Sequence, residues 1–67
     1  MKVASLIARK GARWRSIKAG SEVTDLRRRF KAIASDRGKV GKIQYEEVIL
    51  LESSGQTKRR KYSAKPD

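Results

Sequence analysis

Residues 21–36 read SEVTDLRRRFKAIASD, and this stretch decides the fold that the sequence predicts. Its apolar residues recur at intervals of three and four, the spacing of one face of an α-helix. They are Val23, Leu26, Phe30, Ile33 and Ala34. Ser21 is a candidate N-cap, and Gly38 follows where a left-handed residue commonly ends a helix. The stretch therefore predicts an amphipathic helix from Ser21 to about Asp36.

Two short segments with β-branched and aromatic residues precede this helix. They are Lys2 to Arg9 and Ala12 to Ile17, and Lys10 and Gly11 separate them. Because glycine tolerates the positive φ of tight turns, this pattern predicts a β-hairpin. The apolar spacing also permits a short first helix, since runs this short are ambiguous by periodicity. The hairpin is the preferred interpretation, with Lys18 to Gly20 as the loop into the helix.

The segment after the helix predicts a second pair of strands. Asp36 to Lys42 is rich in glycine and basic residues and is interpreted as a flexible connection. Ile43 to Glu52 contains an unbroken apolar run, Val48 to Leu51, which fits a strand buried on both faces. A turn at Ser53 to Gln56 then predicts an antiparallel return over Thr57 to Tyr62. This last strand is polar on both faces, as suits a sheet edge.

These elements predict an α+β fold of order β-β-α-β-β, a small antiparallel sheet with one central amphipathic helix. The order β-α-β-β is the alternative. In the simplest register of the second hairpin, Glu52 faces Thr57 and Leu50 faces Arg59. Residues 1–62 are expected to form a single small basic domain, and residues 63–67 a disordered tail.

The inventory of side chains argues against catalysis. The 67 residues include neither Cys nor His, which removes disulfides, Cys/His zinc sites and the commonest general base. Glu46 and Glu47 are adjacent, so in a strand they would point to opposite faces and could not act as a pair. We therefore expect no enzymatic activity, no cofactor and no metal.

The chain also has no apolar stretch of the roughly 18 residues that a membrane span needs. The apolar start of the chain is too short for a signal peptide, because Arg9 and Lys10 interrupt it. We expect a cytoplasmic protein without a membrane partner.

The charge points to a polyanionic partner. Eighteen Lys and Arg against seven Asp and Glu give a formal net charge of +11, and a bound polyanion would relieve the self-repulsion of the compact state. We predict a small, non-catalytic nucleic-acid-binding module that acts mainly through phosphate contacts. The candidate contact residues are Arg13, Arg15, Arg28, Lys31, Arg59 and Lys61.

Trp14 has two interpretations. It lies among cations, as in sites where a base stacks on an aromatic ring. A lone Trp in so small a domain is more often part of the core, and burial is the preferred expectation. In a strand, Trp14 would share a face with Ala12 and Ser16, and Arg13 and Arg15 would share the other face.

The alternative function is a small structural or protein-interaction domain. Its partner would be another protein, docked along the sheet edge at Thr57 to Tyr62 or on an apolar patch at Val48 to Leu51.

Overall fold

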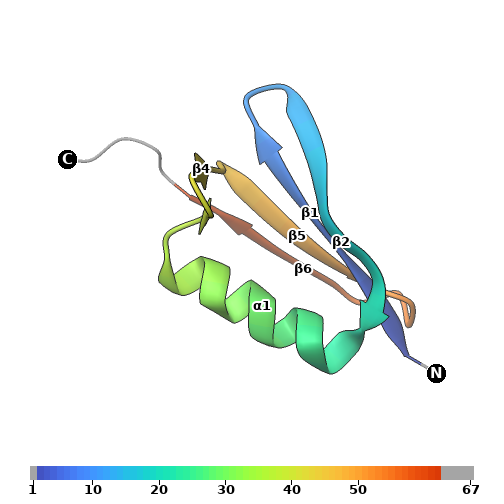
Figure 1. Cartoon of the computed structure of the whole chain (residues 1–67). Coiled ribbons are helices and arrows are strands. Elements are labelled where there is room, and N and C mark those ends of the chain that lie inside the picture. The colour runs from blue at the N-terminus through green and yellow to red at the C-terminus, as the bar shows by residue number, and fades with distance from the viewer. Residues whose placement is uncertain (1, 63–67) are drawn as a thin grey trace.

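The computed structural model describes residues 2–62, which form one helix, a four-stranded sheet and a separate two-stranded sheet (Figure 1). The elements in chain order are β1 (Val3–Lys10), β2 (Arg13–Glu22), α1 (Val23–Ser35), β3 (Lys39–Val40), β4 (Ile43–Gln44), β5 (Glu47–Glu52) and β6 (Thr57–Lys61). The main sheet is antiparallel with the order β2-β1-β5-β6. The predicted α+β fold is confirmed, with a short β3–β4 hairpin inserted after the helix. The predicted tail, residues 63–67, lies outside the described residues.

The first hairpin is confirmed, and the alternative of a first helix is wrong. Gly11 is the first residue of a two-residue turn and has φ +61°, the conformation that glycine supplies in a type II′ hairpin turn. The predicted loop at Lys18 to Gly20 is also wrong, because β2 continues as far as Glu22. Two irregularities interrupt its pairing with β1. Such bulges bend and twist a strand, which lets β2 lead directly into α1.

The helix begins two residues later than predicted. Ser21 is not the N-cap, because it still pairs with β1 as part of β2. Glu22 occupies the N-cap position and makes no capping hydrogen bond with its side chain. The strand before the helix therefore sets its start.

The helix ends in a Schellman motif. The Gly38 N–H donates to the Ile33 carbonyl at 2.8 Å, and the Arg37 N–H donates to the Ala34 carbonyl at 3.1 Å. Arg37 adopts the left-handed conformation at φ +56°, one residue before the predicted position, and Gly38 follows at φ +86°. A Cβ on Gly38 would lie 2.6 Å from the ring of Tyr62. Only glycine fits where Tyr62 packs against the end of the helix.

The core lies between α1 and one face of the main sheet (Figure 1). Alternate side chains of β1 point toward the helix, and so do their partners on β5. The core residues are Ala4, Leu6, Ala8, Val23, Leu26, Ile33, Tyr45, Val48 and Leu50, with Phe30 partly buried beside them. In the described part of the chain, no helix or strand covers the other face of the sheet.

The predicted strand from Ile43 to Glu52 is divided in two. Gly41, at φ +62°, lies in the turn that folds β4 back onto β3. The Tyr45 N–H then donates to the Gly38 carbonyl at 2.9 Å, so this residue is bonded to the end of the helix. As a result, the long strand of the sheet starts only at β5. The segment from Asp36 to Lys42 is a helix end and half of a hairpin rather than an irregular connection.

The register of the second hairpin differs from the prediction by one residue. The Glu52 N–H donates to the Gln56 carbonyl at 2.9 Å, which reduces the loop to residues 53–55, with Gly55 at φ +97°. Three-residue hairpin loops commonly place a left-handed residue at this position. Leu50 therefore faces Lys58 instead of Arg59. The position of β6 at the edge of the sheet is as predicted.

Candidate nucleic-acid interface

The six predicted contact residues are distributed over three surfaces, two on each. They are Arg13 and Arg15 on β2, Arg28 and Lys31 on α1, and Arg59 and Lys61 on β6. All six are exposed. Because β2 and β6 form opposite edges of the sheet, the structure does not gather these residues into one patch.

Arg13 and Arg15 line a cleft on the helix side of the sheet. Arg15 pairs with Ala8, whose side chain belongs to the core, and paired residues share a face. The cleft has a volume of about 270 Å³ and lies between the two hairpins that precede β5. Its lining residues are Lys10, Arg13, Arg15, Ile43 and Tyr45. Three cations and no carboxylate therefore surround a space with an aromatic wall.

The contribution of Tyr45 and Ile43 to this cleft was missed by sequence reasoning, which assigned both to the long strand. Two glycines three residues apart, Gly38 and Gly41, are the signal that could have revealed the β3–β4 hairpin.

The face of the sheet away from α1 carries aromatic, apolar and charged side chains. Two successive rows of residues cross its four strands. In the order β2, β1, β5, β6 they are Trp14, Arg9, Glu47 and Lys61, then Ser16, Ile7, Ile49 and Arg59. We refer to these two rows as the open face. The alternation predicted for β2 is confirmed: Trp14 and Ser16 lie on this side, and the two arginines lie on the other.

The expected burial of Trp14 is wrong. Its side chain is 47% exposed, because β2 is an edge strand and no described element covers this side of the sheet. Leu51, the other large exposed apolar residue within residues 2–62, is 41% exposed. The middle of the open face is better shielded, since Ile49 is only 6% exposed.

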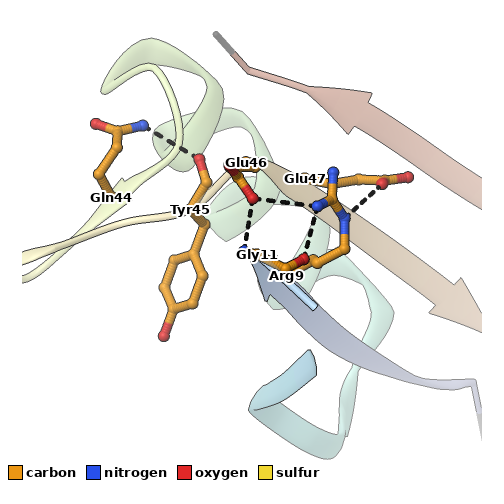
Figure 2. A network of polar contacts seen from close by, with 6 residues as sticks. All are labelled: Arg9, Gly11, Gln44, Tyr45, Glu46 and Glu47. Carbon is orange, nitrogen blue, oxygen red and sulfur yellow. Dashed lines mark hydrogen bonds and ion pairs between the residues drawn. The ribbon is translucent and has the colours of Figure 1, made fainter. Parts of the chain in front are cut away.

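Arg9 binds both acidic residues at the start of β5 (Figure 2). Its Nη1 lies 3.1 Å from Glu46 Oε2 and its Nε lies 3.2 Å from Glu47 Oε1. The Gly11 N–H donates to Glu46 Oε2 at 2.6 Å, and its carbonyl accepts from Arg9 Nη1 at 2.8 Å. The expectation that the two glutamates diverge is wrong, because Glu46 precedes the strand. Arg59 Nε lies 2.9 Å from Glu47 Oε2, so this cation also has an internal partner.

Arg27 and Glu52 form a bidentate ion pair between α1 and the end of β5. Arg27 Nε and Nη2 each donate to a Glu52 oxygen at 2.9 Å. These hydrogen bonds hold the pKa of the Glu52 carboxyl below its usual value, although its burial acts in the opposite direction. The same pairing raises the pKa of Arg27. Together with Arg9 and Arg59, Arg27 completes the set of basic residues that form ion pairs within residues 2–62.

Within residues 2–62, no three His, Cys, Asp or Glu side chains are grouped so that they could hold a metal ion. The helix of this region has 13 residues, too few to cross a membrane.

The fold defines a small α+β domain in which a helix covers one face of a four-stranded antiparallel sheet. Comparisons with protein-family models, curated proteins and solved structures gave no match.

Proposed function

We propose that this chain is a small, non-catalytic nucleic-acid-binding domain that acts mainly through phosphate contacts. The proposal rests on how the charged side chains are distributed between internal ion pairs and the exposed surface. The three glutamates in and next to β5 are each bound by an arginine, namely Arg9, Arg27 or Arg59. The remaining basic side chains of residues 2–62 lie outside these ion pairs, and many of them are exposed. A net charge of +11 is thus presented mainly as unneutralised cations at the surface.

The cleft on the helix side is the best candidate for phosphate contact. Lys10, Arg13 and Arg15 converge there without a carboxylate among its lining residues. Arginine binds phosphate with a planar fork of donors, so two arginines on one strand can hold adjacent phosphates. Arg28 and Lys31 supply a second, weaker surface on α1. Arg59 is a poorer candidate than its sequence suggests, because its Nε already lies 2.9 Å from Glu47 Oε2 in an ion pair.

The test compares double charge reversals of equal charge. Arg13 and Arg15, or Arg28 and Lys31, are changed to Glu, and Arg37 and Lys39, which do not line the cleft, provide the control of equal charge. Affinities for duplex and single-stranded DNA are measured at two salt concentrations. We expect the Arg13/Arg15 pair to lose markedly more affinity than the control. The salt slope of that variant should also fall, by about 0.9 per lost phosphate contact on duplex DNA.

Two results would contradict the proposal. Equal losses of affinity in all three variants would mean that binding depends only on the overall charge of the protein, because each variant changes the net charge by the same amount. Absence of binding to any nucleic acid at low salt would reject the function itself.

A protein-interaction domain remains the second candidate, favoured by the two unpaired edges of the sheet, β2 and β6. The four consecutive cations of β6 would suit an acidic peptide that adds as a further strand. This function would be favoured if an acidic peptide protected the β6 amides from hydrogen exchange while nucleic acid left the NMR spectrum of the protein unchanged.

A further inference from the structure

Trp14 occupies an unusual position for the only tryptophan of a small domain. It is 47% exposed, on an edge strand and on the open face of the sheet. Only Arg13 separates it from the tight turn at Gly11 and Ala12, so it lies near the projecting tip of the first hairpin (Figure 1). Leu26, Leu50, Tyr45 and other apolar side chains fill the core without it. Its exposed ring is therefore available to a ligand.

Basic residues neighbour Trp14 along its own strand and across its row of the sheet, where Arg9 on β1 pairs with it directly and is itself held by Glu46 and Glu47. Arg13 and Arg15 flank Trp14 in sequence and are exposed. They project to the opposite face, but β2 is an edge strand, so the outer side of its backbone has no neighbouring strand. Two long side chains at such an edge can reach a ligand that passes alongside it.

We infer that the ligand of this edge is single-stranded nucleic acid, with one base stacked on the Trp14 indole and the adjoining phosphates held by Arg13 and Arg15. The inference rests on the proposed function and adds the strandedness of the ligand. An aromatic ring between cations suits an unpaired base, whose face is free to stack. In a duplex both faces of a base are covered by its neighbours, so Trp14 would contribute little there. The positive charge of the domain complements the phosphates and disfavours a second copy of this chain as the occupant.

The experiment uses the intrinsic fluorescence of Trp14, which reports only this site because the chain has one tryptophan. The intact protein is titrated with oligothymidylate of about 12 nucleotides, within the site sizes of small single-strand-binding folds. Duplex DNA of equal length and inorganic polyphosphate, a polyanion without bases, are the matched ligands. We expect strong quenching with oligothymidylate and much weaker quenching with the other two at equal saturation.

Substitution of the ring provides the second measurement. Trp14→Ala should lower the affinity for oligothymidylate about fivefold or more, the lower end of what one stacked base contributes. It should leave duplex binding nearly unchanged. Trp14→Phe keeps an aromatic face and should retain most of the affinity. Leu51→Ala removes a similarly exposed apolar side chain from the same side of the sheet and should cost less. Thermal melts of all variants separate lost binding from lost folding.

The outcomes distinguish the inference from the proposed function. Equal effects of Trp14→Ala on single-stranded and duplex affinity, or binding of oligothymidylate without quenching, would overturn the inference and leave phosphate-mediated binding intact. A concentration-dependent blue shift of the emission without nucleic acid would instead place a second copy of the chain on Trp14, and would also overturn it. If neither form of nucleic acid binds, both proposals fail.

Discussion

Replacing Gly38 by Ala should strongly destabilise the domain, for two separable reasons. Gly38 has φ +86°, where a side chain with a Cβ is strained by about 1–2 kcal/mol. The new Cβ would also lie 2.6 Å from Tyr62 Cδ2 and 2.8 Å from the Tyr45 carbonyl oxygen, both too close for real atoms. Tyr62 must then move. Truncating a fully buried aromatic costs about 3–5 kcal/mol, so displacing this half-buried ring should cost about 1–2 kcal/mol.

The expected loss in the free energy of unfolding is therefore about 2–4 kcal/mol, close to the total of about 3–5 kcal/mol that a core of this size supplies. Gly41→Ala is the matched control. Gly41 has φ +62° with nothing within 4 Å of the new Cβ, so only the backbone cost applies. Urea titrations followed by circular dichroism give both values by linear extrapolation. Equal destabilisation by Gly38→Ala and Gly41→Ala would refute the reasoning, because the contact with Tyr62 would then contribute nothing.

Two further changes test the core and the main ion pair. Leu26→Ala removes a side chain that is 1% exposed and should cost about 3 kcal/mol in unfolding free energy, which loss of NMR dispersion or a lower urea midpoint would report. Arg27→Gln removes the partner that keeps the pKa of Glu52 low, so the variant should be less stable than the parent at neutral pH. The contribution of ionised Glu52 to stability is fully present above its ordinary pKa of 4.5 and disappears as the pH falls through the lowered pKa. The urea midpoints of the parent and the variant should therefore converge in acid. A difference between the two midpoints that is constant with pH would contradict this assignment.

Local patterns predicted the parts of the fold that local residues determine. The three- and four-residue spacing identified the buried stripe of α1, in which Val23, Leu26 and Ile33 are indeed core residues. Gly11 identified the first turn, since a tight hairpin needs the backbone conformation that glycine supplies. These features depend on neighbours within a few positions along the chain.

The features that sequence reasoning missed depend on distant residues. The apolar pattern of Ile43 to Glu52 is continuous, yet the strand is interrupted where Tyr45 bonds to Gly38 and Glu46 bonds to Arg9. The exposure of Trp14 follows from the order of strands, which places β2 at an edge, and no pattern within β2 specifies that order. The candidate cleft was incomplete for the same reason, because Tyr45 reaches it only through the unforeseen β3–β4 hairpin.

The strand order also has a consequence for how the chain folds. Two of the three pairings in the main sheet, β1 with β2 and β5 with β6, join strands that follow one another through tight loops. The third, β1 with β5, brings together strands separated by β2, α1 and the β3–β4 hairpin. The local hairpins can form on the microsecond scale, whereas the central pairing must first close a long loop. The rate of folding should therefore be limited by the encounter of the preformed β1–β2 and β5–β6 hairpins, with α1 packing as they meet.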